Sequence, residues 1–175
     1  DACVREYSEL LGNTKNIDIS EVTKVRDLGY QLLYLGQHEY SKNALEKALK
    51  LNETAYGKQD IRYVYALRDL AGVYMLLIRY TEAAGMFEEA LSAIENTLGK
   101  NSYEYLAGLN DMAVVHLRAQ DWRKAKKYCK MGLKKLKSDG TQNNFHFAII
   151  HNNLGVCAKN AYNFQAAVKS FEKAL

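Results

Sequence analysis

A period of 42 residues runs along most of this chain and limits what it can fold into. Small residues recur at this interval, at Ala48, Ala90, Gly132 and Ala174. Three residues before each of them stands an apolar residue in the same register, at Leu45, Phe87, Cys129 and Phe171. A fixed period of this length predicts one supersecondary unit that is copied along the chain, because each copy buries its apolar face only against its neighbours.

Each copy has the residue spacing of a pair of helices. Apolar residues recur every three or four positions, as in Leu67, Leu70, Ala71 and Tyr74, which is the helical period. A large residue followed by a small one recurs at Leu28-Gly29, Leu70-Ala71, Met112-Ala113 and Leu154-Gly155. Small residues are needed where two helices cross closely, since a larger side chain would separate the backbones. The chain contains no proline, which favours uninterrupted helices, so we predict an all-α fold of antiparallel helix pairs.

Polar and glycine positions predict where the helices begin and end. First and second helices separate near residues 36–38, 79–81 and 120–121, with Thr81 and Asp121 as N-caps. Gly57 and Gly99 suit left-handed C-caps, and Gly140 lies in a looser segment. These breaks predict four repeats at 20–57, 58–99, 100–141 and 142–175, of which the last is truncated. Residues 1–19 are predicted to hold the N-terminal helix of a preceding irregular repeat or cap, plus a linker.

The order of large, small and aromatic positions over residues 21–175 resembles the tetratricopeptide repeat. The linker at 95–100 (ENTLGK) and the first-helix core at 109–114 (LNDMAV) are similar to the repeats of kinesin light chains and nephrocystin-like proteins. The resemblance implies a right-handed superhelix, or α-solenoid, in which the first helix of each pair lines a concave groove. It also implies a non-catalytic scaffold that binds a protein or peptide, such as a cargo adaptor or an assembly module, with a cytoplasmic location and cytoskeletal association as a family trait.

The same resemblance selects candidate groove residues on the first helices. They are Arg26, Tyr30, Tyr34, Tyr65, Arg68, Asp69, Asn110, Arg118, Asn152, Asn153 and Lys159. Arginine and lysine suit carboxylates, tyrosine offers rigid contact area, and asparagine can bond a peptide backbone. An extended acidic peptide with an apolar or aromatic anchor fits this set. In the alternative interpretation, the charged residues form ion pairs between repeats and the tyrosines pack between helices.

A second candidate surface is strongly basic. Eight of the fifteen residues 123–137 are Lys or Arg, and all of these charges are expected to face outward on a convex side, with Lys127, Lys130 and Lys134 as the candidate contact residues. This surface predicts an alternative function: a structural spacer in a larger complex that contacts partners or polyanions through the helix at 121–137. A solvated helix surface explains the same charges. Because the net charge is only +4 and no nucleic-acid motif is present, nucleic acid is not the favoured partner.

The sequence offers little chemistry for catalysis. It contains no Gly-rich phosphate loop, CxxC, HExxH or nucleophile elbow, so we expect neither an enzyme nor a cofactor or metal site. No run of about 20 apolar residues is present, so membrane insertion is not expected. Cys3, Cys129 and Cys157 have no paired spacing, which favours reduced thiols. The identity of the partner and the oligomeric state stay open.

Overall fold

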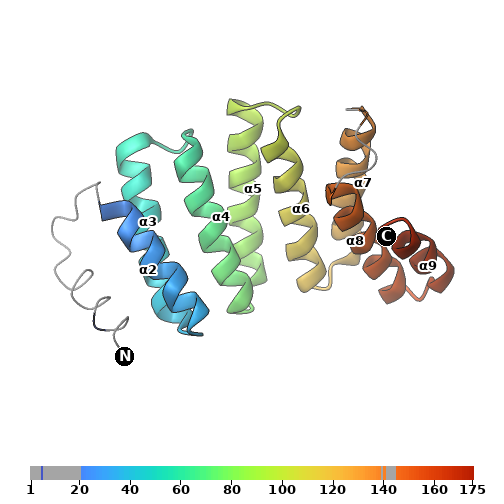
Figure 1. Ribbon diagram of the computed structural model, residues 1–175, viewed down its shortest axis with the longest axis horizontal. Coiled ribbons are helices and arrows are strands. Elements are labelled where there is room, and N and C mark those ends of the chain that lie inside the picture. The colour runs from blue at the N-terminus through green and yellow to red at the C-terminus, as the bar shows by residue number, and fades with distance from the viewer. Residues whose placement is uncertain (1–4, 6–20, 139, 141–144) are drawn as a thin grey trace. The chain divides into compact units, whose positions relative to one another are not determined.

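The computed structural model describes residues 5, 21–138, 140 and 145–175, and these residues form helices and turns without a strand (Figure 1). The helices are α2 (Val22–Tyr34), α3 (His38–Tyr56), α4 (Ile61–Leu76), α5 (Tyr80–Thr97), α6 (Tyr103–Arg118), α7 (Trp122–Ser138), α8 (Phe145–Asn160) and α9 (Phe164–Glu172). The fold is all-α, as predicted. The even-numbered helices are the first helices of the pairs. The N-terminal helix predicted within residues 1–19 lies outside the described residues, apart from Arg5.

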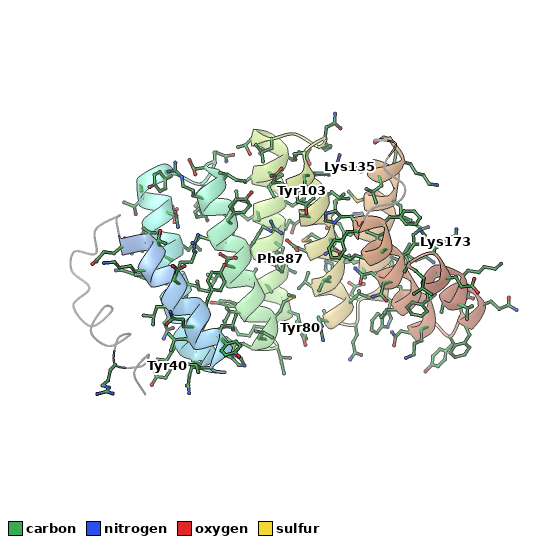
Figure 2. All side chains as sticks on the ribbon, in the orientation of Figure 1. Tyr40, Tyr80, Phe87, Tyr103, Lys135 and Lys173 are labelled. Carbon is green, nitrogen blue, oxygen red and sulfur yellow. The ribbon has the colours of Figure 1, made fainter. Side chains whose placement is uncertain are left out.

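The chain divides into two compact units, residues 1–93 and 94–175, and the division falls inside α5. In the first unit, polar contacts join successive helices. The Ser41 hydroxyl on α3 donates a buried hydrogen bond of 2.7 Å to the Gly29 carbonyl on α2. The Tyr74 hydroxyl on α4 donates to Glu46 Oε1 on α3 at 2.8 Å. Phe87 is among the apolar side chains that fill the core of this unit (Figure 2).

Glycine is required where the two helices of a pair cross most closely. A Cβ added at Gly29 would lie 2.8 Å from both Cγ and Cδ2 of Leu45. In the second unit, a Cβ at Gly155 would lie 2.5 Å from Cε1 of Phe171. Both pairs occupy the same two positions of the 42-residue period. The small residues of the repeat are therefore packing residues, as the sequence predicted.

The core of the second unit is built from α6, α7 and α8. Its central cluster contains Leu106, Ala113, Cys129, Leu136 and Ile150. Gly132 lies beside this cluster, where an added Cβ would approach Ile150 Cδ1 to 2.7 Å. The contact between Gly132 and Ile150 thus also requires a small residue at this position of the period. In contrast, Ala174 lies beyond the end of α9 and is only half-buried.

Asp121 caps α7 as predicted, because its Oδ1 accepts a hydrogen bond of 3.0 Å from the Lys124 backbone N–H. The prediction for Thr81 was wrong, since α5 begins at Tyr80 and Thr81 lies inside its first turn. The position that precedes each second helix is Asp121 in the third repeat and Arg79 in the second. Thr81 comes two residues too late to cap the helix.

The turn between the first and second helix of every pair contains one residue with positive φ. These residues are 42 apart, with φ of 72° at Gly36, 62° at Ile78, 60° at Gln120 and 56° at Tyr162. Positive φ strains any residue with a side chain, and a β-branched residue most of all. Gly57 and Gly99 also have positive φ, as expected, but Gly57 combines a φ of 77° with a ψ of 167°, so its ψ is extended rather than left-handed helical.

Among the described residues, no helix is both long and apolar enough to cross a lipid bilayer.

Candidate interaction surfaces

A hollow in the first unit lies where α2, α3 and α4 meet. It is lined by Val22, Thr23, Arg26, Asn52, Tyr56, Arg62, Tyr65 and Ala66. Two of the predicted groove residues, Arg26 and Tyr65, are therefore neighbours in space. Tyr56 and Arg62 join them, and sequence reasoning missed both because it considered only one face of the first helices, whereas Tyr56 belongs to the end of α3.

The Arg62 guanidinium is held in a fixed position at this hollow. Its Nε and Nη2 each donate a hydrogen bond of 2.8 Å to the Asp60 carboxylate, which also accepts the Arg62 backbone N–H. The guanidinium carbon lies 3.3 Å from the centroid of the Tyr56 ring. These hydrogen bonds lower the pKa of Asp60 to about 2. The arrangement presents a positioned cation and an aromatic ring together.

Arg26 is less completely satisfied than Arg62. Its Nη2 lies 3.4 Å from Asp27 Oδ1, which is long for a hydrogen bond between charged groups. Its Nε is buried and has no hydrogen-bond partner within the described part of the chain. A buried donor without an acceptor costs free energy. The Arg26 guanidinium is therefore suited to an acceptor that a ligand would supply.

Tyr30 and Asp69 connect the first helices α2 and α4 through a side-chain hydrogen bond from the Tyr30 hydroxyl to the Asp69 carboxylate. Burial raises the pKa of Tyr30, and the hydrogen bond raises it further. Burial also raises the pKa of Asp69, although Tyr30, Arg26 and Arg68 each act to lower it. This hydrogen bond joins two neighbouring first helices of the first unit.

A second hollow lies at the C-terminal end of α2. Tyr30, Gln31, Tyr34 and Leu35 line it. The Tyr34 side chain is 93% exposed and Leu35 is 47% exposed. Tyr34 is thus one of the most exposed large apolar side chains in the described residues, and it gives the first unit an apolar contact surface separate from the Arg26 hollow.

The predicted groove residues of the second unit lie on α6 and α8. The Asn153 side-chain amide donates a hydrogen bond of 3.1 Å to Asn110 Oδ1, which joins the two helices. Asn153 is buried and Asn110 is half-buried, whereas Asn152, Arg118 and Lys159 are exposed. The structure brings Asn110 and Asn153 together and leaves the three exposed residues in contact with solvent.

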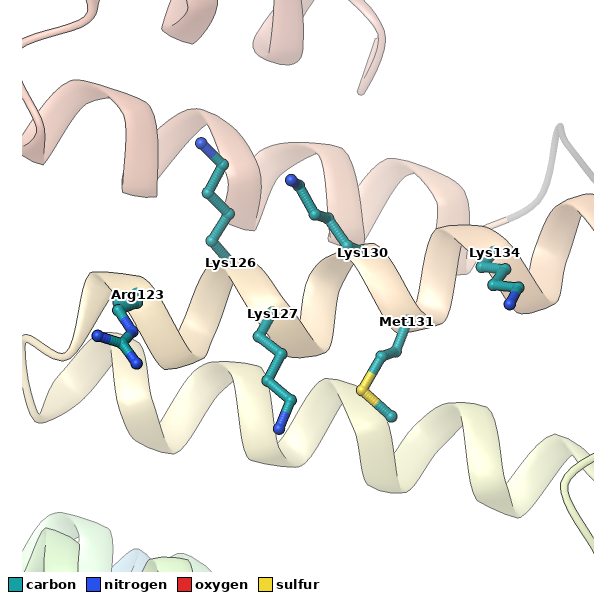
Figure 3. A pocket seen from close by; sticks show the side chains of 6 residues that line it. All are labelled: Arg123, Lys126, Lys127, Lys130, Met131 and Lys134. Carbon is teal, nitrogen blue, oxygen red and sulfur yellow. The ribbon is translucent and has the colours of Figure 1, made fainter.

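The basic surface lies on α7. Arg123, Lys126, Lys127, Lys130, Met131 and Lys134 line a shallow hollow along this helix (Figure 3). The three lysines predicted to face outward, Lys127, Lys130 and Lys134, are exposed. The expectation that all the basic residues of this helix face outward was wrong for Lys135, which is only 9% exposed.

Two histidines of α8 are packed rather than arranged for chemistry. The His151 ring is buried against Phe147, with centroids 4.3 Å apart, and its Nδ1 has no partner among the described residues. Burial, followed by Lys173 and Lys137, lowers the pKa of His151. Burial also lowers the pKa of His146, whose ring meets the edge of Tyr103. In the described ranges, no three metal-ligating side chains come together.

Antiparallel helix pairs that repeat every 42 residues, with small residues at the crossings, place this chain among the α-helical repeat proteins. Residues 65–138 match the family model described as tetratricopeptide repeat. This matched part of the chain therefore carries tetratricopeptide repeats, a fold that serves as a scaffold for protein interactions. No curated protein matches its sequence significantly.

Solved structures with the same fold include kinesin light chain-like repeat proteins. BtubC (BKLC) from P. vanneervenii is 20% identical, with a TM-score of 0.78 over 96% of this chain and 68% of that one. A putative kinesin light chain of Podospora anserina, with nearly identical TPR-like repeats, is 13% identical, with a TM-score of 0.83 over 98% of this chain and 81% of that one. MamA is 17% identical, with a TM-score of 0.65 over 98% of this chain and 84% of that one. At these identities the likeness concerns the fold.

Proposed function

We propose that the protein is a binding scaffold whose first unit holds an extended acidic segment of a partner protein against α2 and α4. The observation that carries this proposal is the buried Arg26 Nε, which has no acceptor within the described residues and lies at a hollow that also contains Arg62, Tyr56 and Tyr65. A partner carboxylate would supply that acceptor, and forked guanidinium groups bind carboxylates well. No catalytic step is needed for this role.

The spacing of the two hollows suggests what the bound segment contains. Arg26 and Tyr34 are eight residues apart on α2, which corresponds to about 12 Å along the helix axis. An extended peptide covers that distance in roughly four residues. The best ligand therefore has an Asp or Glu near Arg26 and an apolar or aromatic side chain about four residues away, over Tyr34 and Leu35.

The test uses a fluorescein-labelled synthetic peptide with one Glu and one Trp at that spacing, and a second peptide in which Gln replaces the Glu. Fluorescence anisotropy measures binding to the whole chain. Arg26→Glu is expected to weaken binding of the Glu peptide by about tenfold or more, and Tyr65→Ala by a smaller factor. Arg26 is a better target than Arg68, because Arg26 lines the hollow and its Nε has no acceptor within the described residues.

Lys50→Glu is the matched control, because it makes the same charge change at an exposed position of α3 in the same unit. This variant should bind like the wild type. Equal affinity for the Glu and Gln peptides, or equal losses for Arg26→Glu and Lys50→Glu, would show that no carboxylate is recognised at this hollow.

We further propose that the chain is organised as the four repeats at 20–57, 58–99, 100–141 and 142–175, because a helix pair lies in each range. A cytoplasmic site of action is part of the proposal as well. The free, buried thiols of Cys129 and Cys157 fit a reducing compartment, and burial raises the pKa of Cys129 to about 12, which keeps that thiol protonated.

A further inference from the structure

Exposed cations form a single stripe along α7. The stripe consists of Arg123, Lys126, Lys127, Lys130 and Lys134. Residues spaced three and four apart share one face of a helix, and the stripe extends over roughly 16 Å at the helical rise. Lys126 and Lys130 project to one side of the helix, while Lys127 and Met131 project to the other (Figure 3).

The stripe has no acidic counterpart within the described residues. Elsewhere in these residues cations often have carboxylate partners, such as Arg79 with Glu82 and Lys100 with Glu95, both at 2.8 Å. Residues 122–138 contain no Asp or Glu, and Asp121 pairs with Lys124, which lies outside the stripe. Like charges four residues apart on a helix each cost about 0.2–0.5 kcal/mol. The chain therefore keeps a repulsive arrangement that no carboxylate in its described part offsets, although Lys127 Nζ lies 5.7 Å from the centroid of the Tyr128 ring.

The repeat itself provides a comparison that separates this stripe from an ordinary solvated surface. The five equivalent positions of α5, 42 residues earlier, are Thr81, Ala84, Gly85, Glu88 and Ser92. Residues 80–97 contain four Glu and no Lys or Arg. A second helix of this chain thus has no need of lysines at these positions. Residues 94–175 contain 13 of the 24 Lys and Arg and 6 of the 20 Asp and Glu, a net charge of +7, whereas residues 1–93 have −3.

We propose that the α7 stripe is a second docking surface and that its occupant is an acidic helical segment of a partner protein. Half-buried Met131 lies beside the cations, and lysine stems add apolar surface, so the stripe combines apolar contact area with positive charge. Spacings of four, three and four residues between Arg123, Lys127, Lys130 and Lys134 match the seam along which one helix packs on another. A helix of about 11–12 residues covers the length of the stripe.

Single-stranded nucleic acid fits this surface less well. Proteins that bind single strands without sequence preference use exposed aromatic rings on which bases stack, and the stripe has none. Tyr128, the aromatic residue on the same helix, is half-buried and stacks on His116 with ring centroids 5.7 Å apart. A membrane-binding helix would present large apolar side chains beside its cations, whereas Met131 is the single apolar residue that lines the hollow.

This inference does not depend on the function proposed for the first unit. The stripe lies on α7, in the unit of residues 94–175, and the Arg26 hollow lies in the unit of residues 1–93. The variants that test the two sites are therefore different. Loss of one binding activity without the other identifies which proposal has failed.

The experiment uses the whole chain and a fluorescein-labelled helical peptide with Glu at every third or fourth position and a central Leu. The Lys127→Glu, Lys134→Glu double variant is expected to weaken binding at least tenfold, because each attraction becomes a repulsion. Lys169→Glu in α9 makes one such charge change at an exposed position in the same unit, and it should stay within about twofold of the wild type. Binding to the wild type should also weaken as salt is added.

Circular dichroism establishes that each variant folds, and the Lys127→Gln, Lys134→Gln variant replaces the reversal if the latter unfolds. Unchanged peptide binding in the folded double variant would overturn the proposal. So would tighter binding of a single-stranded oligonucleotide or of phosphatidylserine vesicles than of the peptide. Sedimentation that reveals self-association, abolished by the double variant, would identify a second copy of the chain as the occupant and would equally overturn the proposal.

Discussion

The close crossing of α2 and α3 predicts a large difference between two glycine-to-alanine changes in the first unit. At Gly29, the new methyl group would lie 2.8 Å from Cγ and Cδ2 of Leu45. Leu45 is only 1% exposed and cannot swing into solvent. The hydrogen bond from Ser41 to the Gly29 carbonyl also holds the two helices together. Either the helices must separate or Leu45 must leave its rotamer.

Two effects oppose each other in Gly29→Ala. Alanine is favoured over glycine inside a helix by about 1 kcal/mol, and overpacking a core costs about 1–3 kcal/mol. At Gly85 in α5, an added Cβ has no atom within 4 Å, so Gly85→Ala has the first effect without the second. The free energies of unfolding of the two variants should therefore differ by about 1–3 kcal/mol, with Gly85→Ala the more stable.

Urea unfolding followed by far-UV circular dichroism measures both variants. A third comparison identifies the cause. In a Leu45→Ala background the clash is absent, so Gly29→Ala should become stabilising, and a double-mutant cycle should report a coupling between the two positions. If Gly29→Ala and Gly85→Ala have the same free energy of unfolding, or if the cycle shows no coupling, the close crossing does not exist as described.

Three further predictions concern turns and helix ends. Ile78→Asn should stabilise the chain by about 0.5–1 kcal/mol in urea unfolding, since asparagine tolerates positive φ and the 73% exposed Ile78 side chain loses little packing. Arg62→Gln should raise the pKa of Asp60 from about 2 towards 3.8 in an NMR titration. Because the folded pKa is depressed, the stabilising contribution of Asp60 is present above pH 3.8 and is lost as the pH falls to about 2. Asp121→Ala should cost about 1 kcal/mol through loss of the cap, whereas Thr81→Ala should change stability by less than about 0.5 kcal/mol; equal losses would contradict the assigned helix starts.

The 42-residue period alone predicts the helix pairs and the reason for their small residues. Packing between neighbouring copies requires the same residue sizes in every copy, whichever residues are exposed to solvent. Asp121 was predictable for the same reason, since a cap needs only a local side chain. The prediction of Thr81 as an N-cap was wrong because threonine can cap a helix only from the position before it. Thr81 lies two residues after that position, inside α5. The prediction that Lys135 faces outward was wrong because the long aliphatic stem of a lysine can cover apolar surface as an apolar side chain does. The residue type alone does not reveal which lysine is buried in this way.

The surfaces were less predictable than the core. The proximity of Arg26 to Arg62 and Tyr56 depends on how the end of α3 meets the starts of α2 and α4, and the period of a single helix does not contain that information. The bond between Tyr30 and Asp69 joins residues 39 apart, which differs from the period by three residues, about one helical turn. A search of the sequence for hydrogen-bonding partners separated by 42 residues plus or minus one helical turn would have found this bond.

The α7 stripe also governs how the molecule behaves toward charged materials that are not its partners. A chain with a net charge of +4 would be expected to adhere weakly to a cation-exchange resin or to silica. Such materials respond to the densest local charge on a protein, and here five cations without described counterions lie on one helix face. Retention on the resin, and losses to glassware at low salt, should therefore depend more on the local charge of the α7 stripe in the second unit than on the isoelectric point of the whole chain.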